Sequence, residues 1–179
     1  PLKYADRFER VYCFEASYPN FRTTQSAIED DGLSNCTVFN LAASNESGKI
    51  KTLEWSSGSR PYGGCVRETH NEKHPVERRF DVSHNVLTIT LEDMMSLVSE
   101  KKIDYLKVDI EGAEYDFLYG QDLSNIDIIS LEVHSDILGY RKSKDLTKYI
   151  KSQGFDKFKL NRGTNFDITF VHKRIDVRK

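Results

Sequence analysis

The stretch Lys107-Val108-Asp109-Ile110-Glu111-Gly112-Ala113-Glu114 decides how this chain folds, because it joins a strand to a helix at a cluster of charges. Residues 103–109 read as a buried strand, and side chains alternate between the two faces of a strand. Lys107 and Asp109 therefore lie on one side of this strand, and Val108 lies on the other. A lysine and a carboxylate thus reach the carboxyl end of the strand together.

A short helix is expected directly after this strand, over residues 111–119, and Gly120 ends it. Glu111 and Glu114 fall in its first turn, where the positive end of the helix dipole favours negative charge. Gly112 permits a tight turn or the close approach of a ligand. Three carboxylates and one lysine so close together would be costly for packing alone, so the stretch indicates a chemical site. The alternative is a structural role, in which the acids stabilise the start of the helix and the lysine pairs with one of them.

Strand-like and helix-like stretches alternate along the rest of the chain. We expect strands over residues 10–15, 37–42, 49–53, 103–109, 126–133, 155–160 and 166–172, and helices over 19–31, 91–101, 111–119 and 143–153. Thr90 can cap the second helix, and a loop containing Gly163 suits a hairpin between the last two strands. This order predicts one α/β domain over residues 1–179, built on a mostly parallel sheet with an antiparallel C-terminal strand.

Length and composition exclude several classes of protein. The 179 residues suit one domain, and 26 Lys and Arg against 28 Asp and Glu give a formal charge of −2. This balance argues against nucleic acid as a partner, and no apolar run approaches the roughly 18 residues that a membrane-spanning helix requires. Three cysteines far apart, without a C-x-x-C pair, indicate a reducing compartment, so we expect a cytoplasmic protein. These features leave the oligomeric state open.

Ligands bind to open α/β sheets at the carboxyl ends of the strands, and four residues end strands here: Glu15, Ala42, Asp109 and His134. Glu15 follows the first apolar run. In a nucleotide-binding α/β fold, an acid at this place accepts hydrogen bonds from both ribose hydroxyls, because two carboxylate oxygens match a vicinal diol. The alternative is a solvated charge at the end of a strand, and position alone does not separate the two.

Glu132 and His134 close the strand that follows the 107–114 stretch, and alternation places both on one face. If sequential strands are neighbours, a carboxylate and an imidazole meet the region of Asp109. Histidine takes up a proton near neutral pH, which suits it to acid–base catalysis. A purely structural histidine at the end of a strand is the alternative.

The sequence resembles the FkbM-type methyltransferase family, which uses S-adenosylmethionine. The main resemblance is at residues 105–115, YLKVDIEGAEY, which are close to the family hallmark K-x-D-x-E-G-x-E. Weaker matches lie in the same order as in the family, namely VYCFE at 11–15, PNF at 19–21, TLEDM at 90–94 and LEVH at 131–134. Together they cover most of the chain.

This resemblance implies a Rossmann-like class I methyltransferase fold, whose sheet has the strand order 3-2-1-4-5-7-6 with strand 7 antiparallel. It also implies that Glu15 holds the ribose of S-adenosylmethionine, that Ala42 and Ala43 lie near the adenine, and that Asp109 faces the site of methyl transfer. The implied activity is O-methylation of a hydroxyl on a sugar or another small molecule. This small-molecule acceptor would be the partner of the chain.

Methyl transfer to a hydroxyl needs a group that removes the hydroxyl proton, and such a base adds about 10²–10⁴-fold to the rate. Asp109 and His134 are the candidates for this base, with Lys107 and Glu132 orienting groups or the acceptor. A rival mode is a divalent metal held by Asp109, Glu111 and Glu132, which would polarise the hydroxyl. We expect no metal, because further oxygen ligands are not obvious in the sequence.

One part of the family pattern is not found, namely the first strand and its glycine-rich loop, which belong upstream of Glu15. Residues 1–9 resemble the end of the helix that follows this loop. We therefore expect the natural protein to continue upstream with the loop. The same observation motivates an alternative from another class, a non-catalytic methyltransferase-like module that keeps the fold and binds a partner.

Residues 54–85 form the longest stretch without a regular pattern, and we expect a long loop insertion that forms part of the acceptor site. Its side chains suit an anionic or sugar acceptor, with Arg60, Arg67, Arg78, Arg79, His70 and His74 for charge and Trp55 and Tyr62 for stacking. The alternative is a mobile surface loop whose charges are solvated.

Overall fold

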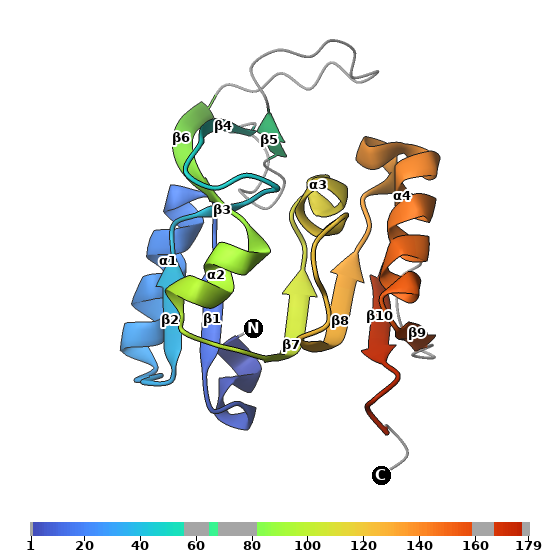
Figure 1. Ribbon diagram of the computed structural model, residues 1–179. Helices are drawn as coiled ribbons and strands as arrows, with labels where there is room; N and C mark the ends of the chain where they lie inside the picture. The colour runs from blue at the N-terminus through green and yellow to red at the C-terminus, as the bar shows by residue number, and fades with distance from the viewer. Residues whose placement is uncertain (1, 56–64, 68–81, 159–166, 177–179) are drawn as a thin grey trace. The chain divides into compact units, whose positions relative to one another are not determined.

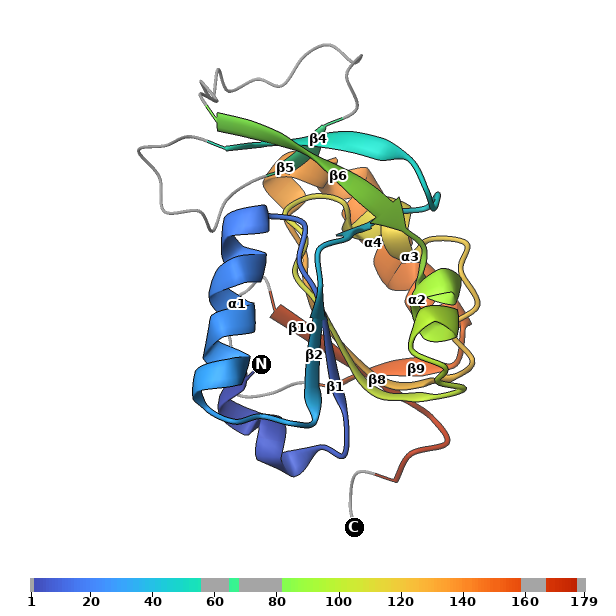
Figure 2. The ribbon, with the colours of Figure 1, turned by 90° about the vertical axis from the view of Figure 1, so that its left-hand side faces the viewer.

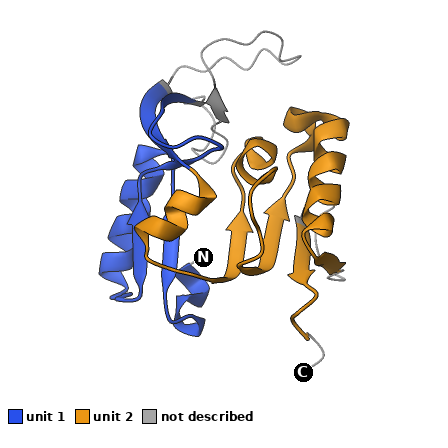
Figure 3. Ribbon diagram, in the orientation of Figure 1, with its two compact units in different colours: residues 1–89 blue, residues 90–179 orange. Residues whose placement is uncertain are grey.

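The computed structural model describes residues 2–55, 65–67, 82–158 and 167–176 of the chain. These residues form a mixed α/β structure with both parallel and antiparallel strand pairs (Figure 1). The chain divides into two compact units, Pro1–Ile89 and Thr90–Lys179 (Figure 3). That they make up one methyltransferase-like domain over residues 1–179 stays a prediction.

The first unit begins with two parallel strands joined by a helix. Its first elements are a 3-10 helix (Leu2–Arg7), strand β1 (Val11–Phe14), helix α1 (Tyr18–Asp30) and strand β2 (Cys36–Phe39). β1 and β2 pair in parallel, and α1 lies alongside β2 (Figure 2). A proline in its first turn starts α1, since its fixed φ suits that position. The helix expected over residues 19–31 is therefore confirmed to within one residue.

A second sheet of this unit has the strand order β3-β6-β4-β5. Its strands are β3 (Ala42–Ala43), β4 (Ile50–Trp55), β5 (Cys65–Arg67) and β6 (Val82–Ile89). β3 and β6 are parallel, whereas β4 runs antiparallel to both β5 and β6. Ala42, Leu53 and Val86 are buried together in this sheet. The expectation of a mostly parallel arrangement is therefore wrong for β4, whose partners on both sides are antiparallel.

Strand structure reaches into the range 54–85, where we expected a long loop insertion. β4 continues to Trp55, β5 occupies Cys65–Arg67, and β6 begins at Val82. The expectation of irregular structure is wrong at these positions, because their backbones pair with one another in antiparallel register. Most of the side chains proposed for the acceptor site lie outside the described residues, so their role stays a prediction.

The second unit is built on one sheet with the strand order β7-β8-β10-β9. Its elements along the chain are α2 (Leu91–Leu97), β7 (Ile103–Val108), α3 (Glu114–Leu118), β8 (Ile126–Glu132), α4 (Ser135–Ser152), β9 (Phe155–Phe158) and β10 (Asp167–His172). β7 and β8 are parallel, and β10 runs antiparallel to β8 and to β9. The antiparallel C-terminal strand is confirmed.

The core of the second unit includes β8 and one face of α4. Ile126, Ile129 and Leu131 of β8 are at most 1% exposed, and Leu146 and Ile150 of α4 are fully buried. Burial of these side chains removes apolar surface from water, which stabilises the unit by about 25 cal/mol for each Å². The apolar run at 126–133 and the helical spacing in α4 predicted both features.

β7 is less buried than we expected for residues 103–109. Val108 is buried, Ile103 and Leu106 are half-buried, and the other three side chains of the strand are exposed. The reason is the place of β7 at the end of its four-stranded sheet, where β8 is its hydrogen-bonded neighbour on one side. The apolar pattern of the strand does not reveal this position.

Three helices begin or end at other residues than the pattern indicates. The helix expected over 111–119 is α3, which spans Glu114–Leu118, because Glu111 and Gly112 have positive φ angles. Thr90 caps α2 as expected, because its hydroxyl accepts a hydrogen bond from the backbone N–H three residues on, at 3.2 Å. The helix nevertheless ends at Leu97, since Ser99 has a φ of +56°. α4 begins at Ser135 rather than at 143 and is interrupted at Gly139, whose φ of +78° is not helical.

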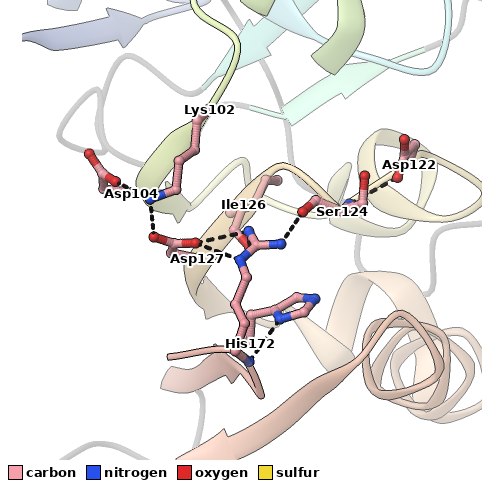
Figure 4. Close-up of polar contacts among 8 residues, drawn as sticks. Lys102, Asp104, Asp122, Ser124, Ile126, Asp127 and His172 are labelled. Atoms are coloured by element: carbon pink, nitrogen blue, oxygen red, sulfur yellow. Dashed lines mark hydrogen bonds and ion pairs between the residues drawn. The ribbon is translucent and has the colours of Figure 1, made fainter. Parts of the chain in front are cut away.

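A polar network holds the amino ends of β7 and β8 (Figure 4). Asp127 is 6% exposed and pairs with Lys102, before β7, and with Arg174, after β10. Arg174 also donates hydrogen bonds to the backbone carbonyl oxygens of Ser124 and Ile126. These contacts fasten the segment after β10 to the start of β8. They lie at the opposite end of these strands from the 107–114 stretch.

Candidate active site

The candidate catalytic residues of the second unit meet at the carboxyl ends of β7 and β8. These strands are parallel, with Lys107 opposite Ser130, so both end at the same edge of the sheet. Asp109 directly follows β7, Glu132 is the last residue of β8, and His134 is the N-cap residue of α4. The expectation that Lys107, Asp109, Glu132 and His134 come together is therefore confirmed.

The carboxylates of Asp109 and Glu132 both lie between the ammonium group of Lys107 and the imidazole of His134. Lys107 Nζ is 3.8 Å from Asp109 Oδ2 and 3.7 Å from Glu132 Oε2. The other oxygens face His134, whose Nε2 is 4.0 Å from Asp109 Oδ1 and 3.9 Å from Glu132 Oε1. Lys107 on one side and His134 on the other thus hold two negative charges close together.

A backbone turn between β7 and α3 brings two more glutamates into this group. Glu111 has a φ of +50° and Gly112 a φ of +101°, so neither continues a helix, and α3 begins only at Glu114. A side chain at Gly112 would also meet Ile137, since an added Cβ would lie 2.4 Å from its Cγ2 atom. Gly112 therefore serves the tight turn that we expected of it.

Glu114 binds His134 from inside the protein. Its side chain is 0% exposed, and Oε1 lies 2.6 Å from His134 Nδ1 and also accepts a hydrogen bond from the N–H of Gly112 at 2.9 Å. Its other oxygen, Oε2, is buried and has no hydrogen-bond partner among the described residues. The imidazole is thereby fixed with Nδ1 inward and Nε2 toward the other carboxylates.

This environment keeps His134 protonated. The hydrogen bond from Nδ1 to Glu114 raises the pKa of His134 to about 9, against the opposing effect of burial, and the negative charges of Glu111 and Asp109 add to it. On the other side of the ring, Glu111 Oε2 lies 3.4 Å from Nε2. Burial raises the pKa of Glu111, and the charges of Asp109, Glu132 and Glu114 raise it further against the opposing charge of His134.

Among the described residues, the cluster has more negative than positive groups. Four carboxylates (Asp109, Glu111, Glu114 and Glu132) face two cationic side chains, Lys107 and His134. The sequence indicated Glu111 and Glu114 as acids in a first helical turn and did not reveal that both contact the histidine. The signal that could have revealed it is Gly112 between them, because a glycine at that place allows the chain to turn back.

In the first unit, Glu15 directly follows β1, at the predicted carboxyl end of the strand. Its Oε1 accepts a hydrogen bond from the N–H of Ser17 at 2.7 Å, and its backbone carbonyl accepts one from the Asn40 side chain at 2.8 Å. His84, a residue that the sequence did not single out, lies with Nε2 2.8 Å from the carbonyl oxygen of Ala16. The carboxylate of Glu15 is thus held in place at the end of its strand.

Ala42 and Ala43 form β3, which pairs with Thr88 and Ile89 of β6. The side chain of Ala42 is 1% exposed and belongs to the buried core of the sheet, whereas Ala43 is half-buried. Contact with an adenine at this place would therefore be made by Ala43 or by the backbone. That contact stays a prediction.

A comparison with protein families matches residues 5–157 to the methyltransferase FkbM domain. The chain belongs to the FkbM methyltransferase family. The matched residues include every candidate site residue from Glu15 to His134, and family membership supports a methyltransferase function in general terms. No curated protein and no solved structure matched this FkbM-family chain. Among its described segments, no helix combines the length and the apolarity needed to span a lipid bilayer.

Proposed function

We propose that this FkbM-family protein transfers a methyl group from S-adenosylmethionine to a hydroxyl oxygen of a small molecule such as a sugar. The observation that carries the proposal is the family match over a site that unites acidic and basic groups at two neighbouring strand ends. Family membership supports the methyl transfer, and the chemistry of the cluster supports a hydroxyl as its acceptor.

The strand orders within the two units support a Rossmann-like class I methyltransferase fold. The order β7-β8-β10-β9, with β10 antiparallel, corresponds to the order 4-5-7-6 with strand 7 antiparallel. The parallel pair β1-β2 corresponds to strands 2 and 3 of the same order. The sheet of the second unit and the β1-β2 pair of the first unit thus each agree with one part of the sheet that the family resemblance implies, whereas the β3-β6-β4-β5 sheet is not part of that order.

Glu15 suits the ribose of S-adenosylmethionine. A carboxylate offers about four lone-pair sites, so accepting the N–H of Ser17 leaves capacity for a vicinal diol. The backbone hydrogen bond from Asn40 fixes the turn that carries the acid. When bound, S-adenosylmethionine supplies an electrophilic methyl group, and the residues of the chain position the acceptor for an in-line displacement.

Asp109 is the better placed of the two candidate bases. With a pKa of about 9, His134 carries a proton on both ring nitrogens near neutral pH and lacks a lone pair for the hydroxyl proton. Asp109 is a carboxylate with a side chain that is 43% exposed, so an acceptor can reach it. We therefore assign proton acceptance to Asp109, and charge balance and orientation to Lys107, Glu132 and His134.

A transfer assay on the complete gene product tests this function. Methyl-labelled S-adenosylmethionine is incubated with the protein and a small-molecule extract, and label in small-molecule products is measured before and after mild alkali. We expect alkali-stable label, since methyl ethers survive alkali and methyl esters do not. Asp109→Asn should lower the rate about 10²–10⁴-fold, because the base is lost.

The matched control is Asp104→Asn, which removes a carboxylate from the other end of β7 and should leave the rate unchanged. Label that is released by alkali would contradict a hydroxyl acceptor. A rate that Asp109→Asn and Asp104→Asn lower equally would contradict the assignment of Asp109.

A further inference from the structure

Although the sequence led us to expect no metal, we propose that Asp109, Glu132 and His134 bind a divalent first-row metal cation. One ligand atom from each of these residues can be chosen so that all of them lie within 4.8 Å of one another. His134 Nε2 stands 4.0 Å from Asp109 Oδ1 and 3.9 Å from Glu132 Oε1. Two ligands of one ion, each about 2.1 Å from it, stand roughly 3.0–4.2 Å apart, so these spacings suit a shared cation.

The orientation of each ligand supports this assignment. Lys107 takes Asp109 Oδ2 and Glu132 Oε2, at 3.8 and 3.7 Å, which leaves Oδ1 and Oε1 turned toward Nε2. One oxygen of each carboxylate is therefore turned toward the same imidazole nitrogen. A distance of 3.9–4.0 Å is too long for a hydrogen bond, so the three atoms are near one another without bonding directly.

Glu114 fixes the orientation of the proposed histidine ligand. Histidines that bind a metal through one ring nitrogen almost always donate the other N–H to a carboxylate or a carbonyl, which fixes the ring. His134 donates Nδ1–H to Glu114 at 2.6 Å, from a carboxylate that is 0% exposed and whose second oxygen has no partner among the described residues. The ring thus presents Nε2, in the orientation that such a metal ligand needs.

The charge of the cluster has the sign that a cation requires. In the part of the chain that the structure describes, its four carboxylates outnumber its two cationic side chains, and a divalent ion at Nε2 would take the place of one proton there. Imidazole together with carboxylates favours a first-row transition metal over Mg²⁺ or Ca²⁺, which take oxygen ligands alone. Mn²⁺ accepts this mixed set and is the probe of choice.

The use of the cation rests on the proposed function, whereas its binding does not. A cation on Oδ1 and Oε1 would polarise an acceptor hydroxyl, and the Oδ2 atom of Asp109 would remain beside Lys107 to accept the proton. Binding and proton acceptance thus use different oxygens of one carboxylate.

Electron paramagnetic resonance tests the site on the complete gene product, since the signal of hydrated Mn²⁺ disappears on binding. We expect saturable binding of one Mn²⁺ per chain. Asp109→Asn and Glu132→Gln should each weaken it at least 10-fold, and Glu114→Gln should weaken it about 10–100-fold, as expected when a partner of a metal-binding histidine is changed. Asp104→Asn is the matched control and should bind as the wild type does.

Circular dichroism melts of all four variants show whether each is folded, and S-adenosylmethionine binding is measured in EDTA on the same preparations. The absence of saturable Mn²⁺ binding, or binding that none of the three site variants weakens, would overturn the cation site. Cofactor binding without Mn²⁺ binding would overturn the site and leave the proposed function intact. Mn²⁺ binding without cofactor binding would support the site and overturn the proposed function.

Discussion

The imidazole of His134 is bound by a carboxylate that has no contact with solvent, since Nδ1 lies 2.6 Å from Oε1 of the fully buried Glu114. Two elements make this contact: α3 brings the glutamate and the start of α4 brings the histidine. The pair therefore joins the two strand ends of the site from below the surface. Its contribution to the stability of the protein can be measured.

Glu114→Ala should destabilise the protein by about 2–3 kcal/mol, because it leaves the Nδ1–H of a protonated and largely buried imidazole without its hydrogen-bond partner. Glu114→Gln keeps an oxygen for the N–H groups of Gly112 and His134 and should cost about 1–2 kcal/mol. Asp116→Ala, on the exposed side of the same helix, is the control and should change stability by less than about 0.5 kcal/mol. Urea unfolding measures all three, and equal stabilities of Glu114→Ala and Asp116→Ala would contradict the pairing.

Gly112→Ala should destabilise the protein more than Gly120→Ala does. Both glycines have positive φ, +101° and +85°, so both substitutions carry a backbone cost of about 1–3 kcal/mol. At Gly112 the new Cβ would also lie 2.4 Å from Ile137 Cγ2, whereas at Gly120 no atom lies within 4 Å. The difference should be about 1–3 kcal/mol in urea unfolding. If the two variants were equally stable, the close approach of α4 to this turn would be refuted.

Acid should destabilise the protein through Asp127. Burial by itself would raise the pKa of Asp127, but the hydrogen bonds from Lys102 and Arg174 outweigh it and hold the pKa below the usual 3.8. A carboxyl with a lowered folded pKa binds its proton more readily in the unfolded chain. Its contribution to the free energy of unfolding is therefore present above about pH 4 and is lost as the pH falls through the folded pKa.

Asp127→Asn removes this titration, so its free energy of unfolding should fall less steeply below about pH 4 than that of the wild type. At pH 7 the variant should be less stable by about 1–2 kcal/mol, a modest value because Lys102 and Arg174 remain partly solvated. Asp156→Asn, at an exposed carboxylate, should keep the wild-type slope. Thermal unfolding between pH 2.5 and 7 compares the slopes, and identical slopes in the wild type and Asp127→Asn would rule out this role.

The sequence predicts the position of the site better than its internal contacts. Asp109, Glu132 and His134 follow apolar runs, and parallel neighbouring strands bring their ends together, so local patterns sufficed to place them. The contacts of Glu111 and Glu114 depend on two consecutive positive φ angles, and a pattern of charges cannot reveal these. A glutamate that begins a helix has the same sequence pattern whether it is exposed or, like Glu114, buried against a histidine.

For the fold as well, local sequence patterns predicted some features and not others. Apolar runs predicted the buried strand β8, but they overestimated the burial of β7, because burial depends on which strands flank it. The sequence also did not predict the antiparallel partners of β4. β5 is only three residues long, and the sequence on either side of it has no regular apolar pattern. Pairing between distant segments is a property of the folded chain and leaves little trace in a short stretch.

Glu15→Ala should weaken the binding of S-adenosylmethionine by about 2–3 kcal/mol, because charge-assisted hydrogen bonds to the ribose are lost. Glu15→Gln keeps one acceptor oxygen and should retain part of the affinity. Glu9→Ala removes an exposed carboxylate ahead of β1 and is the control, with unchanged affinity. Calorimetric titration of the complete gene product gives the affinities, and melting temperatures show that the variants are folded. Unaltered affinity in Glu15→Ala would refute the ribose assignment.

The most direct test of the central claim is equilibrium dialysis of methyl-labelled S-adenosylmethionine against the complete gene product. A methyltransferase that uses this cofactor must bind it, whatever its acceptor is. We expect saturable binding of one equivalent per chain, displaced by S-adenosylhomocysteine, which lacks the methyl group that is transferred. A folded protein that binds no label above the level of an unrelated protein would contradict methyl transfer from S-adenosylmethionine and favour a non-catalytic module.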